Sequence, residues 1–202
     1  MGQLLSIPIY LVDDEPLVRS AISATLKSHG LVTTEFGSAE EFLGALDELE
    51  RGCIISDVRM PGMSGVELVR QLKANNIDHP VIIMSGMADI ALAVEAMKAG
   101  AADFLEKPLT SAALVEAVSS AALRTADEPP PEKDRSAEIF QTLTRRQLDV
   151  LKGIVEGLPN KLIAYRLGLS PRTVEAYRAA IMERTQAKSL SHLVRMSISA
   201  GL

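Results

Sequence analysis

The sequence predicts an α/β domain with a doubly wound five-stranded parallel sheet, followed by a smaller all-α domain of four helices. Three observations predict this fold class. Short apolar runs alternate five times with helical patterns over the first 124 residues. Beyond a segment with three consecutive prolines no strand pattern appears, and helical patterns fill the rest of the chain. The two parts carry opposite net charges, and a length of 202 residues favours two small domains.

The predicted strands are short runs rich in β-branched and aromatic residues. Runs without polar alternation, such as Val81–Met84, are typical of strands buried on both faces of a parallel sheet. The five predicted strands are Ile7–Asp13, Leu31–Phe36, Cys53–Asp57, Pro80–Ser85 and Ala102–Glu106. The helices predicted after them are Pro16 to about His29, Ser38 to about Glu50, Ser64–Lys73, Asp89–Ala99 and Leu109–Arg124. Five such βα units with short connections predict a doubly wound sheet.

The segment after this domain is predicted to be a linker, because Pro129–Pro131 exclude helix and sheet. The predicted domain boundaries are therefore 1–124, a linker at 125–140, and 141–202. From Glu132 the linker could continue into a helix. The four helices predicted in the last part are Thr144–Gly157, Asn160–Leu167, Pro171–Thr185 and Ser189–Ala200. Thr144 and Gln147 are spaced as a capping box, and Ser170 caps a helix that opens with Pro171.

Charge divides the chain at the same place. Residues 1–125 contain 9 Lys and Arg against 17 Asp and Glu, a net charge of −8. Residues 126–140 carry −3, and residues 141–202 carry +6, from 10 basic and 4 acidic residues. A basic helical segment joined to an acidic one suggests different partners, with the basic part facing nucleic-acid phosphates.

The remaining composition bears on location. The single Cys53 cannot form an internal disulfide, and the first residues lack the basic start of a secretory signal. The apolar runs are shorter than the roughly 20 residues that span a bilayer. A cytoplasmic protein without a membrane partner is expected.

Polar residues stand at the carboxyl ends of four of the five predicted strands. They are Asp13 and Asp14, Asp57, Ser85 and Lys107. Ligands bind at the carboxyl edge of open α/β sheets, so these side chains can converge there. Three close carboxylates repel one another, and Mg²⁺ with oxygen ligands relieves that repulsion. A site of this kind suits nucleophilic attack by one carboxylate on a phosphoryl group, which would give an aspartyl phosphate.

Four motifs around these residues resemble the signature of bacterial response-regulator receiver domains. They are VDDEP at Val12–Pro16, SDVRMPGMSG at Ser56–Gly65, MSG at Met84–Gly86 and EKP at Glu106–Pro108. The resemblance covers residues 5–124. It implies that Asp57 is the phosphoacceptor, and that Asp13, Asp14, Asp57 and the backbone carbonyl of Arg59 hold Mg²⁺.

The same resemblance implies roles for three further side chains. Ser85 would supply a hydroxyl that moves toward the phosphoryl group, and Lys107 would be the counter-ion of that group. Phe104 would supply an aromatic ring that turns inward with Ser85. Ordinary packing remains an alternative for Phe104. The Lys107–Pro108 peptide bond is expected to be cis, as in the family.

The second part contains the helix, short turn and helix of a helix-turn-helix at 160–185. Val174, Tyr177, Ala180 and Ile181 form the predicted core face of its second helix. The opposite arc lacks large apolar groups, so the helix can lie close to base edges in a major groove.

The segment Leu143–Val194 closely resembles the DNA-binding domain of the LuxR, NarL and FixJ regulators. By that resemblance Pro171–Thr185 is the recognition helix and Ser189–Ala200 a helix used for dimer contacts. Phosphates or groove edges would be approached by Lys161, Ser170, Arg172, Thr173 and Arg178. Bases would be faced by Glu175, Ala176 and Ala179. Solvated surface is the alternative reading of the basic residues.

The whole chain resembles a FixJ-type two-component response regulator. That implies a transcription factor, not an enzyme in the ordinary sense, although the receiver would catalyse its own phosphorylation and dephosphorylation. A sensor histidine kinase would phosphorylate Asp57, and phosphorylation would promote homodimerisation and binding to paired half-sites in promoter DNA. RNA polymerase is a further expected partner. The alternatives are a phosphorylation-independent regulator switched by a partner or by redox, and a metal-dependent phosphotransferase.

Overall fold

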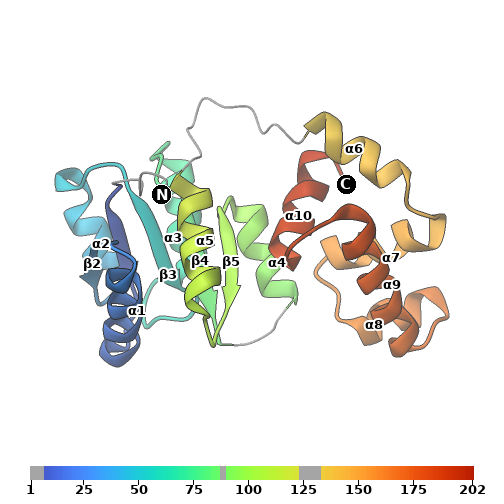
Figure 1. Ribbon diagram of the computed structural model, residues 1–202, viewed down its shortest axis with the longest axis horizontal. Helices are drawn as coiled ribbons and strands as arrows, with labels where there is room; N and C mark the ends of the chain where they lie inside the picture. The colour runs from blue at the N-terminus through green and yellow to red at the C-terminus, as the bar shows by residue number, and fades with distance from the viewer. Residues whose placement is uncertain (1–6, 87–89, 123–132) are drawn as a thin grey trace. The chain divides into compact units, whose positions relative to one another are not determined.

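A computed structural model describes residues 7–86, 90–122 and 133–202. The chain divides into two compact units, one of residues 1–88 and 99–127 and one of residues 89–98 and 128–202 (Figure 1). The helix between the fourth and fifth strands, α4 (Ile90–Ala99), is grouped mostly with the second unit.

The first unit is built on a five-stranded parallel sheet in the order β2-β1-β3-β4-β5. Its strands are β1 (Ile9–Val12), β2 (Thr33–Phe36), β3 (Cys53–Asp57), β4 (Val81–Ser85) and β5 (Asp103–Glu106). Every residue of β1, β3 and β4 is buried, as their continuous apolar runs predict. The predicted doubly wound fold is confirmed.

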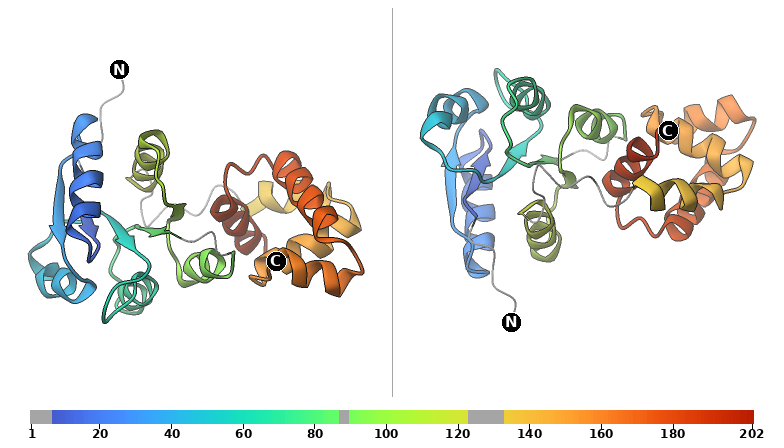
Figure 2. Two further views of the ribbon diagram at one scale, coloured as in Figure 1. Left: turned by 90° about the horizontal axis from the view of Figure 1, so that it is seen from below. Right: turned by 90° about the horizontal axis from the view of Figure 1, so that it is seen from above.

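Helices cover both faces of this sheet. The face covered by α1 (Pro16–Ser28) and α5 (Ser111–Ala122) is opposite to the face covered by α2 (Ala39–Ala45) and α3 (Gly65–Ala74) (Figure 2). The predicted helix to about Glu50 is too long, because α2 ends at Ala45 and one 3₁₀ turn, Leu46–Glu48, follows. Gly44 lies in the last turn of α2, where a residue without a side chain weakens the helix.

Strand register brings distant positions to one edge. Val12 pairs with Ser56, so Asp13 and Asp57 are the next residues along neighbouring strands. Ser85 pairs with Glu106, which places Lys107 directly beyond β5 at the same edge. The carboxyl edge of the sheet therefore brings together Asp57 and Ser85, which end β3 and β4, with Asp13 and Lys107, which follow β1 and β5.

The second unit is helical. Its core contains Val150, Ile154, Ile163, Val174 and Ile181. After residue 132 the described helices are α6 (Lys133–Gln141), α7 (Arg145–Val155), α8 (Asn160–Leu167), α9 (Pro171–Thr185) and α10 (Leu190–Ser199). α9 packs against α7 and α8, and α6 packs against α9 and α10. The capping box predicted for Thr144 and Gln147 is present.

The predicted linker at 125–140 contains structure at its end. Its three prolines lie outside the described residues, whereas α6 begins at Lys133 and contributes Phe140 to the helical core. Four helices were expected in the second domain, and α6 adds one to them. Within the described ranges, no helix combines the length and the apolar character needed to cross a membrane.

Aromatic rings on the α2 and α3 side of the sheet enclose a histidine. Tyr10 lies 5.8 Å from Phe42 and 5.9 Å from His79, measured between ring centroids. The His79 ring is buried, and its Nδ1 lies 3.2 Å from the Gly52 amide nitrogen and 3.1 Å from the Gly52 carbonyl oxygen. An unprotonated Nδ1 accepts from the amide, whereas a protonated Nδ1 donates to the carbonyl oxygen.

Burial lowers the pKa of His79 below its usual value of 6.5, and the nearby Arg51 charge acts in the same direction. The hydrogen bond with Gly52 and the charge of Asp78 oppose this shift without reversing it. The unfolded chain therefore binds a proton at a pH where the folded chain does not.

The free energy of unfolding should consequently fall as the pH drops from about 6.5 toward 5, where most carboxylates are still ionised. His79→Gln should weaken this decline, because the group that titrates differently in the two states is gone. Urea unfolding at several pH values measures it, with the exposed His29→Gln as control. An undiminished decline in His79→Gln would contradict the assignment.

Candidate functional site

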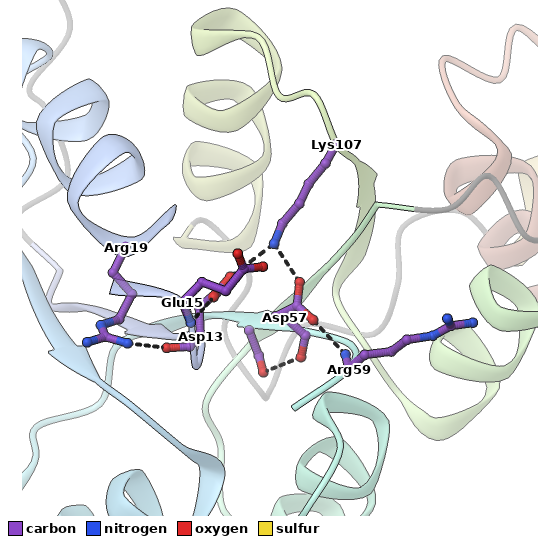
Figure 3. Close-up of polar contacts among 7 residues, drawn as sticks. Asp13, Glu15, Arg19, Asp57, Arg59 and Lys107 are labelled. Atoms are coloured by element: carbon purple, nitrogen blue, oxygen red, sulfur yellow. Dashed lines mark hydrogen bonds and ion pairs between the residues drawn. The ribbon is translucent and has the colours of Figure 1, made fainter. Parts of the chain in front are cut away.

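An ion-paired cluster lies at the carboxyl edge of the sheet (Figure 3). The Lys107 ammonium lies 3.0 Å from Asp13 Oδ2 and 2.5 Å from Asp57 Oδ1. Asp13 is 0% exposed and Asp57 is 8% exposed. The Lys107 ammonium thus joins two carboxylates, the more distant of which lies 94 positions away in the sequence.

Backbone amides hold the remaining carboxylate oxygens. The Arg59 amide donates to Asp57 Oδ2 at 2.6 Å, and the Glu15 amide donates to Asp13 Oδ1 at 2.9 Å. Both amides belong to the loops that leave the strands. Each carboxylate is therefore oriented by its own loop on one oxygen and by Lys107 on the other.

The charge state of Lys107 follows from its surroundings. Burial lowers the pKa of the Lys107 ammonium, but hydrogen bonds to Asp57 and Asp13 and their negative charges outweigh burial, so the pKa is raised. Lys107 is therefore cationic at neutral pH. Two carboxylates and one ammonium leave the buried cluster with one negative charge in excess.

The loop after β5 places Lys107. The Lys107 amide donates to the Ser85 carbonyl at 2.7 Å, which extends the β4–β5 pairing by one residue. The Lys107–Pro108 peptide bond is cis, as predicted. Ser85 is buried at the end of β4, and Phe104 is half-buried on β5.

A glycine permits the close approach of α3 to the site. A Cβ atom built on Gly65 would overlap the backbone carbonyl oxygen of Asp57 and approach Ser56 Oγ at 2.9 Å. Ser56 Oγ also donates to that carbonyl oxygen at 3.0 Å. A side chain at position 65 would thus displace the backbone that carries Asp57.

Asp14 does not join Asp13 and Asp57. Its side chain is exposed, and no group of three or more acidic, histidine or cysteine residues able to hold a metal occurs among the described residues. The Lys107 ammonium occupies the space between the two buried carboxylates and supplies their positive partner. The oxygen donors of Asp13, Asp57 and the Arg59 loop nevertheless fit a hard divalent cation.

The second unit presents the predicted helix-turn-helix. Gly168 ends α8 with φ of 66°, a left-handed conformation that glycine adopts without strain, and its amide bonds back to α8 carbonyls. Ser170 Oγ accepts from the Thr173 amide at 3.1 Å and caps α9, which begins at Pro171. This turn sets the direction in which α9 leaves α8.

The predicted faces of α9 agree with its burial. Val174 and Ile181 are fully buried, and Tyr177 is half-buried. The residues expected to face DNA are exposed, namely Lys161, Ser170, Arg172, Glu175, Ala176 and Ala179, while Thr173 and Arg178 are half-buried. α9 therefore has one apolar face in the core and one accessible face of charged and small residues.

Arg178 is the most constrained of these side chains. Its Nη1 donates to Asn160 Oδ1 at 2.8 Å, across the angle between α9 and α8. Burial lowers the pKa of the Arg178 guanidinium, and the negative charge of Glu175 opposes this. Sequence reasoning placed Arg178 beside the accessible face but missed Asn160, whose position at the start of α8 carries no distinctive signal.

Sequence reasoning also missed Arg19 on α1. Its Nη1 donates to the backbone carbonyl oxygen of Asp13 at 2.5 Å. Arg19 lies six positions after Asp13 and is the fourth residue of α1. No motif in the sequence marks this contact.

Comparisons with known proteins agree with this architecture. Residues 9–119 match the family model described as "Response regulator receiver domain", and residues 141–197 match "Bacterial regulatory proteins, luxR family". "Transcriptional regulatory protein FixJ" of Azorhizobium caulinodans is 48% identical over 199 residues, covering 98% of this chain and 94% of that protein. FixJ of Rhizobium meliloti is 44% identical over 195 residues, covering 96% of each chain.

A solved structure shows the same likeness. The crystal structure of full-length FixJ from B. japonicum is 43% identical, has a TM-score of 0.56, and covers 97% of this chain and 98% of that chain. Both parts of the chain are thus accounted for by one kind of transcription regulator, which is not a classical enzyme. The chain belongs to the response regulators that join a receiver domain to a LuxR-type DNA-binding domain, and it is closely similar to FixJ.

Proposed function

We propose that Asp57 is the phosphoacceptor of this response regulator and that a cognate sensor histidine kinase is the donor. The observation that carries the proposal is the Lys107 ammonium between Asp57 and the buried Asp13. A phosphorylated Asp57 would then control dimerisation and binding to promoter DNA, and RNA polymerase would be a later partner. The domain boundaries 1–124, 125–140 and 141–202 are proposed with this function.

The chemistry is the formation of an acyl phosphate. A carboxylate oxygen of Asp57 attacks the phosphorus of the donor, and the bond from phosphorus to the donor nitrogen breaks with its electron pair remaining on nitrogen. Lys107 contacts the oxygens of the transferred group and offsets their charge. When bound by Asp13, Asp14, Asp57 and the Arg59 carbonyl, Mg²⁺ supplies further charge neutralisation.

Two side chains near the carboxyl edge are proposed to change position when Asp57 is phosphorylated. The Ser85 hydroxyl would turn toward the phosphoryl oxygens, and Phe104 would turn inward with it. Both belong to strands that border α4 and α5 in sequence, so their movement would alter the surface of α4, β5 and α5. That surface is the proposed dimer contact, and it would place two DNA-binding domains on paired half-sites.

DNA would be bound by the accessible face of α9 and the start of α8. Phosphates or groove edges would be contacted by Lys161, Ser170, Arg172, Thr173 and Arg178, and bases faced by Glu175, Ala176 and Ala179. The net charge of +6 over residues 141–202 and the exposure of this face support the proposal.

Beryllofluoride, which mimics a phosphoryl group on aspartate, should raise the molar mass of the full chain toward that of a dimer. Asp57→Asn should abolish this response, because the coordinating carboxylate is absent. Light scattering after size-exclusion chromatography measures the mass, and the exposed Asp47→Asn is the matched control. A mass increase that persists in Asp57→Asn, or is absent in the unmodified chain, would contradict phosphorylation-driven dimerisation at Asp57.

Lys107→Met should lower the free energy of unfolding without Mg²⁺ by about 3 kcal/mol, because it leaves two adjacent buried carboxylates unpaired. Mg²⁺ should restore most of this loss, since the ion neutralises the same carboxylates. Urea unfolding with and without millimolar Mg²⁺ measures both effects, and the exposed Lys27→Met serves as control. A loss that Mg²⁺ leaves unchanged would count against metal binding at Asp13 and Asp57.

Arg172→Ala should weaken duplex binding by the full chain and reduce the slope of log affinity against log salt by about one, as loss of one phosphate contact predicts. Fluorescence anisotropy with a labelled duplex at several salt concentrations gives the slope. Arg166→Ala is the comparison variant, because Arg166 is already paired with Glu156 at 2.6 Å. Equal slopes for the unmodified chain and Arg172→Ala would refute the phosphate contact.

A further inference from the structure

Arg19 connects the loop after β1 to the neighbouring strand β2. Its side chain is 17% exposed, and its Nε lies 3.6 Å from Glu35 Oε2 on β2. On the same guanidinium, Nη1 donates to the Asp13 carbonyl oxygen at 2.5 Å. The guanidinium thus donates one hydrogen bond to the backbone oxygen and lies next to the Glu35 carboxylate, to which its buried Nε makes no hydrogen bond.

With Arg19 in place, every polar group of Asp13 has a partner. Its amide donates to the Phe36 carbonyl at 3.2 Å, and its two carboxylate oxygens accept from the Glu15 amide and from Lys107. Arg19 holds the remaining group, the carbonyl oxygen. This oxygen belongs to the peptide unit that joins Asp13 to Asp14.

Figure 3 shows Arg19 on the side of Asp13 away from Lys107. The guanidinium therefore does not enter the space between Asp13 and Asp57. Its hydrogen bond holds the Asp13–Asp14 peptide plane from the side opposite to Lys107. The orientation of that plane sets the position of the Asp14 Cα atom. Residues that orient metal ligands without touching the metal influence affinity through such contacts.

We infer that Arg19 is a positioning residue of the acidic site, which sets the affinity for Mg²⁺ by holding the Asp13–Asp14 peptide unit. The inference rests on the proposed function, because Asp13 and Asp14 are metal ligands only in that proposal. It extends the site to α1 and, through Glu35, to β2.

Electrostatics alone predicts the opposite effect. A positive charge near a cation site repels the metal, so removing the Arg19 charge should tighten Mg²⁺ binding if charge were its only influence. Positioning predicts weaker binding when the hydrogen bond to the Asp13 carbonyl is lost. The sign of the change therefore separates the two.

Isothermal titration calorimetry of the full chain with Mg²⁺ alone provides the test. Arg19→Gln should raise the dissociation constant about 10-fold, in the range seen for partners of metal ligands. Arg19→Lys, which keeps the charge but lacks the Nη1 donor, should also bind Mg²⁺ more weakly. Glu35→Gln should raise the dissociation constant by less. An unchanged or lower dissociation constant in Arg19→Gln would overturn the inference.

Arg51→Gln is the matched control, because Arg51 pairs with Asp78 at 2.6 Å before β3, away from the carboxyl edge. Arg51→Gln should lower the free energy of unfolding in urea without changing the Mg²⁺ affinity, so it shows what the loss of an ion pair alone does.

With acetyl phosphate as donor, Arg19→Gln should need more Mg²⁺ for half-maximal phosphorylation, with the rate at saturating Mg²⁺ retained. If the unmodified chain binds no Mg²⁺, the proposed function fails; if it binds and Arg19→Gln binds equally well, only the role of Arg19 fails.

Discussion

The ion pair of Lys107 with Asp13 and Asp57 is the interaction on which the account of the first unit depends. Two carboxylates that are almost completely buried are costly unless a cation accompanies them. The sheet register brings the three residues to one edge, and the amides of Glu15 and Arg59 hold the outer oxygens. Because the cluster keeps one excess negative charge, it remains able to accept a further cation. The same arrangement leaves Asp57 with a carboxylate that Lys107 and the Arg59 amide orient as a nucleophile.

The two units differ in charge and in the kind of site that they present. The acidic first unit places its negative side chains at the carboxyl edge of a parallel sheet, where parallel strands commonly bind ligands. The basic second unit places small and charged side chains on the accessible face of α9 while Val174 and Ile181 anchor that helix in the core. Asn160 adds a second constraint, since its bond to Arg178 joins α9 to α8 across the turn at Gly168. The first unit thus presents its functional side chains at the ends of strands, and the second presents them on a helix.

Much of this could be predicted from the sequence, because the governing signals are local. Continuous apolar runs predict β1, β3 and β4, and the residue after each strand predicts the meeting of Asp13, Asp57 and Lys107. The early end of α2 was missed, because Gly44 weakens a helix whose apolar pattern continues. The helix that was expected to follow Glu132 is present as α6. Asp14 was expected beside Asp13 and Asp57, but its side chain is exposed in the loop after β1. Arg19 and Asn160 act through contacts between elements, which no spacing along the chain reveals.

The most direct test of the account is to locate the phosphoryl group itself. The full chain would be treated with acetyl phosphate and Mg²⁺ and then reduced with borohydride, which converts an aspartyl phosphate to homoserine. Peptide mass spectrometry then identifies the modified position. The account predicts homoserine at residue 57 and at no other aspartate. Modification at Asp13 or Asp14, or no reduction product while phosphate is incorporated elsewhere, would contradict it.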